Sequence, residues 1–212
     1  MRPFILISAL VLALAAAVAP AEAGSVRMFV RHDVADYTTW RQHYNGVAAM
    51  QRKGGVMAQA VYQSADNPND VTVTHEFKTL EKAKAFAASP ELKAGMQSAG
   101  VKGAPQIWFT TQTAGRSGKA GHVRMFVRHD VTDYAAWRKS YDAFAAEQRK
   151  GGVSAQAVYQ SADNPNDVTV LHDFKSLEQA KAFASSPELK ATMQSAGVKG
   201  APQVWFTTRA AK

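Results

Sequence analysis

Residues 62–77 read YQSADNPNDVTVTHEF, and residues 159–174 read YQSADNPNDVTVLHDF. In each copy two runs of alternating side chains flank the segment SADNPND. Asn, Asp and Ser favour turns through side-chain hydrogen bonds to the local backbone, and Pro favours them through its fixed φ angle. Each copy therefore predicts a β-hairpin, whose turn in the first copy covers residues 64–70.

The hairpin is part of a longer duplication. Residues 26–41, VRMFVRHDVADYTTWR, return as VRMFVRHDVTDYAAWR at residues 123–138, and about four positions in five are identical across the two copies. A unit of about ninety residues is long enough to bury a small core of its own. We therefore predict two similar domains, residues 25–111 and 122–208, joined by a flexible linker over residues 112–121 that is rich in Gly, Ser and Lys.

Hydrophobic periodicity predicts the same order of elements in each unit: strand, helix, strand, strand, helix, strand. In the first unit the expected strands are residues 26–32, 56–63, 71–77 and 105–111. Asp36 and Thr79 are the expected N-caps of the two helical regions. This order is the split βαβ, or ferredoxin-like, arrangement. The predicted fold class is α+β, with two tandem ferredoxin-like domains whose sheets face one another within one chain.

The first 23 residues have the composition of a secretory signal peptide. One basic residue, Arg2, precedes an apolar run that extends to about Val18, and small residues precede Gly24. We expect cleavage after Ala23 and a periplasmic or secreted mature protein. No later segment approaches the roughly 18 apolar residues that a membrane-spanning helix needs, so we expect no membrane partner.

Composition excludes several classes of function. The chain has no Cys, which excludes a disulfide framework and thiolate chemistry. Its formal net charge is +8, but the basic residues are spread over predicted strands, helix faces and linker, so we expect no nucleic-acid partner. The sequence also lacks a phosphate-binding glycine loop, a G-x-S-x-G elbow and an H-E-x-x-H helix. Nucleotide and hydrolase chemistry are therefore unsupported.

Three segments carry a resemblance to a known family: RHDVADYTTWRQHY, THEFKTLEKAKAFAASPELKAGMQSAGV and GAPQIWF. They resemble the dimeric α/β-barrel superfamily, in particular its small antibiotic-biosynthesis-monooxygenase-like and cyclase domains, over residues 26–111 and 123–208. The resemblance implies that two four-stranded sheets pack face to face into one barrel, here an intramolecular pseudo-dimer. It also implies a pocket between sheet and helices in each unit. The first strand carries no Asn and the third no Trp, so the motifs of the superfamily's cofactor-free oxygenases are not matched.

Two histidines in each unit are candidate functional residues. His32 ends the first strand and His75 lies near the end of the third, both on the face expected to meet the helices. A right-handed crossover predicts that these strands are parallel neighbours, which would bring the two imidazoles together. His129 and His172 repeat the pattern in the second unit. Aromatic residues of the first helix complete the expected ligand-binding pocket: Tyr37, Trp40, Tyr44, Tyr134, Trp137 and Tyr141.

Three roles for the histidines stay open. They can be hydrogen-bonded fillers at the rim of a core, they can orient or protonate a ligand, or they can be two ligands of a metal. Only two metal ligands are visible in each unit, because Asp33 and Glu76 have the opposite parity, so we predict no metal and no cofactor.

Three functions follow from these roles. The first is an exported protein that binds a small apolar or aromatic molecule. The second is a cofactor-independent monooxygenase-like or cyclase-like enzyme that uses the histidine pair as acid and base. The third is a structural module without a ligand. Whether the chain is an enzyme is left open by the sequence.

Two further expectations concern the faces of the elements. Arg27, Phe29 and Arg31 alternate with the helix-facing residues of the first strand, so they should face the barrel interface. We expect the arginines to meet carboxylates across it, with an anionic ligand as the alternative. Phe144 stands in the second unit where Val47 stands in the first, so the second pocket should be smaller. His43 should face solvent.

Overall fold

The computed structural model describes residues 25–118 and 121–209. The predicted signal peptide lies outside these ranges. Within them, no helix is both long enough and apolar enough to cross a membrane.

The two repeats contain the same elements in the same order. The first repeat comprises β1 (Val26–Val34), α1 (Tyr37–Gly46), α2 (Ala48–Lys53), β2 (Ala58–Ser64), β3 (Asp70–Phe77), α3 (Leu80–Ala87), α4 (Pro90–Ser98) and β4 (Val101–Gly118). The second comprises β5 (Val123–Val131), α5 (Tyr134–Ala143), α6 (Ala145–Lys150), β6 (Ala155–Ser161), β7 (Asp167–Phe174), α7 (Leu177–Ala184), α8 (Pro187–Ser195) and β8 (Val198–Arg209). The predicted order is confirmed, with two short helices in each helical region.

Local sequence signals set the helix ends. The backbone N–H of Thr39 donates to Asp36 Oδ1 at 2.8 Å, and that of Lys82 donates to Thr79 Oγ1 at 3.3 Å. Both side chains thus satisfy a free N–H of the first helical turn, as N-caps do. At the other end of the helical region, Gly100 follows α4 with a φ of +77°, a conformation that glycine adopts without steric cost.

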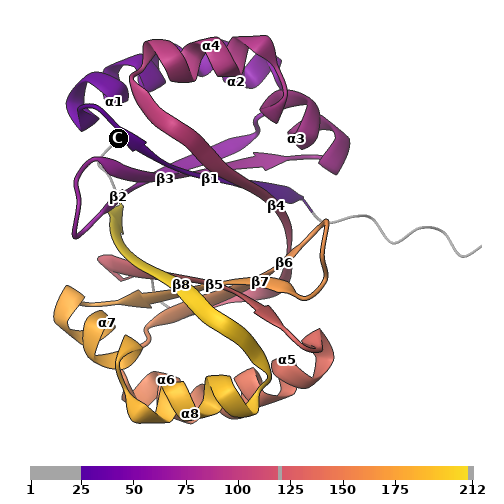
Figure 1. Ribbon diagram of the computed structural model, residues 1–212, viewed down its shortest axis with the longest axis vertical. Coiled ribbons are helices and arrows are strands. Elements are labelled where there is room, and N and C mark those ends of the chain that lie inside the picture. The colour runs from indigo at the N-terminus through magenta and orange to yellow at the C-terminus, as the bar shows by residue number, and fades with distance from the viewer. Residues whose placement is uncertain (1–24, 119–120, 210–212) are drawn as a thin grey trace, which may run out of the picture.

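The eight strands form one closed barrel in the order β1-β3-β2-β8-β5-β7-β6-β4. Two pairings join the repeats, β2 with β8 and β4 with β6, so the barrel is complete only when both repeats are present. Helices α1 to α4 cover the outside of the barrel on the first repeat, and α5 to α8 cover it on the second (Figure 1). The chain is therefore an intramolecular pseudo-dimer of two ferredoxin-like units.

The segment expected to be a flexible linker is partly a strand. Residues 112–118 continue β4, which pairs with β6 from Thr110 opposite Ser161 to Gly118 opposite Ala155. The open edge of β6 presents backbone N–H and C=O groups that need partners, and the end of β4 supplies them. The expectation of a structureless linker is therefore wrong up to Gly118.

The expected parallel pairing of the first and third strands is also wrong. Strands β1 and β3 are antiparallel, with His32 opposite Val71 and Met28 opposite His75. The crossover through α1 and α2 makes β1 parallel to β2, and β3 runs between them in the opposite direction. His32 and His75 thus share one face of the sheet but lie toward opposite ends of the paired strands.

Alternate residues of each strand enter two different cores. On the helix side of the first repeat, Met28 and Val30 pack with Trp40 and Phe86. Inside the barrel, Phe29 stacks on Trp108 with ring centroids 5.0 Å apart. The second repeat stacks Phe126 on Trp205 at the same separation. The predicted direction of Phe29 toward the barrel interface is confirmed.

Candidate functional site

Each repeat holds a cavity between its sheet and its helices, as expected. The first has a volume of about 50 Å³ and is lined by His32 and His75 from the strands and by Trp40 and Tyr44 from α1. The rest of its wall is mainly apolar. At about 10–15 Å³ for one water, this volume has room for about three to five water molecules. The cavity suits a compact ligand.

The second helix-side cavity has the same design and a volume of about 40 Å³. His129 and His172 line it together with Trp137 and Tyr141. Phe144 lines this cavity, whereas Val47 lines the first. The smaller volume has the direction predicted from that substitution.

A row of rings spans the first cavity between the two histidines. The His32 and Trp40 centroids are 5.6 Å apart, and those of Trp40 and Tyr44 are 5.0 Å apart. Tyr44 in turn lies 6.1 Å from His75. Because the strands are antiparallel, the imidazoles do not form a close pair. Instead they stand at the two ends of one aromatic wall.

The hydrogen bonds of His75 define its tautomer. The Tyr44 hydroxyl lies 2.7 Å from Gln59 Oε1 and 3.1 Å from His75 Nε2. An amide oxygen only accepts, so the single hydroxyl proton goes to Gln59, and His75 Nε2–H donates to the Tyr44 oxygen. The other nitrogen, His75 Nδ1, is then an unprotonated acceptor. It is buried and has no hydrogen-bond partner among the described residues.

The second repeat reproduces this network. The Tyr141 hydroxyl lies 2.8 Å from Gln156 Oε1 and 3.0 Å from His172 Nε2. His172 Nδ1 is likewise buried without a hydrogen-bond partner in the described ranges. Each repeat therefore presents one neutral acceptor nitrogen of the same kind.

His32 and His129 make fewer hydrogen bonds than His75 and His172. His32 is 7% exposed and His129 is 6% exposed, yet neither ring nitrogen of either residue has a hydrogen-bond partner within residues 25–118 and 121–209. A neutral imidazole has one donor and one acceptor. Leaving such a group unpaired in a buried place costs about 1–3 kcal/mol.

Burial keeps all four imidazoles neutral. It lowers the pKa of His32 to about 4, although the nearby carboxylates of Asp70 and Asp33 act in the opposite direction. Burial alone lowers the pKa of His75 to about 4. The pKa values of His129 and His172 are also lowered to about 4 by burial, against the opposing effect of a nearby Asp. At neutral pH these side chains act as uncharged donors and acceptors.

Two of the six predicted aromatic residues lie outside the helix-side cavities. Tyr37 and Tyr134 are not among the residues that line the cavities. Tyr37 lies against Trp40 with ring centroids 5.8 Å apart, and the Tyr134 hydroxyl donates to Thr113 Oγ1 at 2.6 Å. His43 is exposed, as expected, but it lies at the cavity of the first repeat.

Sequence reasoning missed part of the cavity wall. Residues Met50 and Gln51 of α2 and Leu92 and Met96 of α4 also line the first cavity. Gln51 is only 4% exposed. A glutamine on the apolar side of a helix is the signal that could have identified it.

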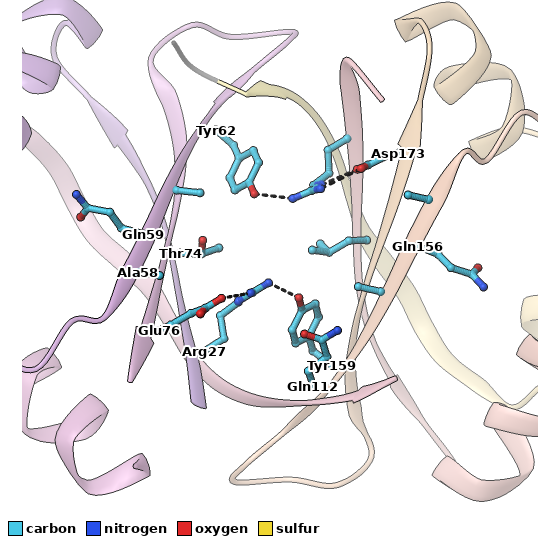
Figure 2. Close-up of a pocket in the computed structure, with 15 residues that line it drawn as sticks. Arg27, Ala58, Gln59, Tyr62, Thr74, Glu76, Gln112, Gln156, Tyr159 and Asp173 are labelled. Atoms are coloured by element: carbon cyan, nitrogen blue, oxygen red, sulfur yellow. Dashed lines mark hydrogen bonds and ion pairs between the residues drawn. The ribbon is translucent and has the colours of Figure 1, made fainter. Parts of the chain in front are cut away.

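A separate cavity of about 260 Å³ lies inside the barrel, between the two repeats (Figure 2). Arg124 donates to both carboxylate oxygens of Asp173, at 2.7 and 3.0 Å, and to the Tyr62 hydroxyl at 2.5 Å. Arg27 donates from Nη2 to one carboxylate oxygen of Glu76, Oε1, and from Nη1 to the hydroxyl of Tyr159.

These bonds correct the expectation that the arginines meet carboxylates across the barrel. Arg27 lies directly opposite Glu76 on neighbouring antiparallel strands, and Arg124 lies directly opposite Asp173. Such cross-strand neighbours are the closest available partners, so each ion pair forms within one repeat. The groups that reach across are the tyrosine hydroxyls.

Comparison of the sequence with protein-family models and with curated proteins finds no match. Solved structures do match the fold. An anthrone oxidase-like protein aligns with a TM-score of 0.66 and 13% identity over 90% of this chain and 93% of its own. A Listeria monocytogenes ferredoxin-fold protein related to antibiotic biosynthesis monooxygenases aligns with a TM-score of 0.52 and 12% identity over 90% and 98%.

A monooxygenase-like protein from Listeria innocua gives a TM-score of 0.52 and 11% identity over 89% of this chain and 96% of its own. In each case the alignment is too long to lie in one repeat, so it includes both. The chain therefore has the dimeric α/β-barrel fold of antibiotic-biosynthesis-monooxygenase-like proteins, with both ferredoxin-like units of the barrel carried by a single polypeptide.

Proposed function

We propose that this protein binds a compact, largely apolar molecule with one hydrogen-bonding group in each of its two helix-side cavities. The observation that carries the proposal is the state of His32 and His129. Both imidazoles are buried at a cavity wall, and no ring nitrogen of either has a partner in the described part of the chain. A ligand that pairs with them removes an energetic cost that the free protein bears.

The chemistry of the cavity restricts the class of ligand. Its wall is aromatic and aliphatic, and its imidazoles are neutral, so it offers no charge to an ion. A neutral imidazole can donate to a carbonyl oxygen or accept from a hydroxyl. We therefore expect an alcohol, a phenol or a ketone with a small carbon skeleton.

The alternative is a cofactor-independent oxygenase-like or cyclase-like enzyme with the histidines as acid and base. The fold supports it, since the aligned structures include proteins described as monooxygenase-like and anthrone oxidase-like. An efficient general base has a pKa near the working pH. The pKa of about 4 for His32 and His75 is well below neutrality, which favours binding over proton abstraction.

We also propose that the mature protein functions in the periplasm or outside the cell. The support is the composition of residues 1–23, with one arginine before an apolar run and small residues before Gly24. Amino-terminal sequencing of the protein isolated from its source organism tests this proposal. The expected first residue is Gly24.

Replacing both His32 and His129 by phenylalanine is expected to abolish ligand binding without lowering the stability of the protein. Phenylalanine fills a similar shape and removes the unpaired polar atoms, so His32→Phe and His129→Phe should leave the melting temperature unchanged or raise it. Binding is measured by ligand-observed NMR with 2-propanol, acetone, cyclohexanol and phenol. The matched control is His122→Ser, at an exposed histidine that lines neither helix-side cavity, and it introduces the residue found at position 25.

Two results would contradict the proposal. One is retention of binding by the double variant. The other is a melting temperature several degrees lower in His32→Phe alone, since about 1 kcal/mol corresponds to roughly 4–8 °C in a domain of this size. That loss would identify the imidazole as a structural group. Turnover of a bound compound that disappears with the histidines would favour the enzymatic alternative instead.

Exchanging the residues that distinguish the two cavities should exchange their affinities. Val47→Phe makes the first cavity resemble the second, and we expect about a tenfold loss of affinity there, which corresponds to about 1.4 kcal/mol. Phe144→Val should strengthen binding in the second cavity by a similar factor. NMR titration of resonances from each repeat measures both sites in one protein. Equal affinities in the unmodified protein would refute the expected difference.

A further inference from the structure

The cavity inside the barrel has a different chemistry from the helix-side cavities. Its volume is about 260 Å³, close to the lower limit of about 300 Å³ for typical small-molecule sites. Side chains from both repeats line it, and hydrogen bonds cross it from Arg27 to Tyr159 and from Arg124 to Tyr62 (Figure 2). Gln59 lines it too, but its side chain points toward the helices, where Tyr44 donates to it.

One positively charged and one negatively charged side chain are both partly exposed on one side of this cavity. The side chains of Arg27 and Glu76 keep 21% and 31% of their surface exposed, whereas those of Arg124 and Asp173 keep 13% and 3%. The first repeat thus offers an N–H donor to an anionic group and a carboxylate to a cationic one.

The formal charges of the four charged side chains at this cavity sum to zero, because two are arginines and two are carboxylates. A bare anion or a bare cation would leave one unbalanced charge in a partly buried place, which is costly. A molecule with one positive and one negative group adds no net charge. It can also pair each group with an opposite charge that is already present.

The two repeats line the cavity with equivalent side chains except at a few positions, one of which makes the second repeat more apolar. The first repeat contributes Thr74, whose equivalent in the second repeat is Leu171. Each repeat also contributes two alanines, Ala58 and Ala60 in the first and Ala155 and Ala157 in the second, so Leu171 is what makes the second side more apolar. A ligand with a charged head facing Arg27 and a short apolar tail facing Leu171 matches this arrangement.

We propose that the cavity inside the barrel binds a small zwitterion, an α-amino acid with a short apolar side chain. Its carboxylate accepts from Arg27 and its ammonium group donates to Glu76. Its side chain lies against Leu171. This site is independent of the helix-side cavities and of the function proposed for them.

Isothermal titration calorimetry with three probes tests the class of ligand. L-Valine carries both charged groups, 3-methylbutanoate lacks the ammonium group, and 2-methylpropylamine lacks the carboxylate. We expect one L-valine to bind per chain, with both analogues at least tenfold weaker. Equal binding of 3-methylbutanoate would show an anion site and overturn the proposal, as would equal binding of the amine or the absence of L-valine binding.

Two variants test the position of the ligand. Thr74→Leu copies the residue of the other repeat and leaves both ion pairs intact, and it should reduce the affinity for L-valine at least tenfold. Glu76→Gln keeps the size but removes the negative charge, so it should weaken L-valine about tenfold and strengthen 3-methylbutanoate. Val47→Phe, which alters only a helix-side cavity, should leave L-valine binding within twofold.

The outcomes separate this proposal from the helix-side function. Loss of L-valine binding in Val47→Phe but not in Thr74→Leu would place the amino acid in the helix-side cavity and refute the barrel site. An unchanged preference between L-valine and 3-methylbutanoate in Glu76→Gln would refute the role of that carboxylate. The melting temperature of each variant shows whether it is folded, and Leu171→Thr provides a second variant that enlarges the cavity.

Discussion

Acidification from pH 6.5 to pH 4 is expected to destabilise the protein steeply, by about 3 kcal/mol for each of its four buried histidines. The unfolded imidazole has a pKa of 6.5, and burial lowers the pKa to about 4 in the folded state for His32, His75, His129 and His172. Between these values the unfolded chain binds more protons, so the free energy of unfolding falls as the pH falls. Above pH 6.5 the contribution is fully present, and below pH 4 no more is lost.

The sum over four histidines is comparable with the whole stability of an ordinary domain, about 5–15 kcal/mol. We therefore expect the protein to unfold within this pH range. Urea denaturation at pH 7, 6, 5 and 4 measures the effect, and His32→Phe should make the pH dependence shallower by up to one proton. A free energy of unfolding that stays constant between pH 6.5 and 4 would show that the imidazoles reach solvent on protonation.

Arg124→Met is expected to cost about 3–5 kcal/mol, the usual penalty for removing one partner of a buried ion pair. Asp173 is 2% exposed and loses the guanidinium group that pairs with both of its oxygens. The Tyr62 hydroxyl loses its partner across the barrel as well. Urea denaturation at pH 7.5 measures the loss.

Arg27→Met is the matched control for this prediction. Its partner Glu76 keeps 31% of its side-chain surface exposed and can be rehydrated, so the loss should be nearer to about 1 kcal/mol. Replacing both members of the buried pair, Arg124→Met with Asp173→Leu, should recover most of the stability. Equal losses in the two single variants would contradict the assignment of Arg124 and Asp173 as the buried pair.

The sequence predicted the features that depend on local pattern. Alternation placed Phe29 in the barrel and Met28 under the helices, and the caps at Asp36 and Thr79 followed from residue type and position. The same alternation is enough to place Tyr62 beside Ala60 inside the barrel. Local rules succeed here because each depends on only a few neighbouring residues.

Features set by distant segments were not predictable in this way. Residues 112–118 have the composition of a linker and become a strand because the edge of β6 lies beside them. The separation of His32 from His75 depends on β3 running between β1 and β2. The His32 nitrogens have no partner in the part of the chain that the structure describes, and this depends on every side chain around the cavity, which no pattern along one strand contains.

Closure of the barrel by strands from opposite repeats has a consequence for synthesis. Strand β2 pairs with residues 207–209 of β8, which are made only after the rest of both repeats. Until then the first repeat exposes the edge of β2 and the inward face that carries Phe29 and Trp108. An exposed edge beside exposed aromatic side chains favours pairing with another chain. The growing polypeptide is therefore most prone to aggregate after its first repeat has formed, and completion of its own second repeat removes that risk.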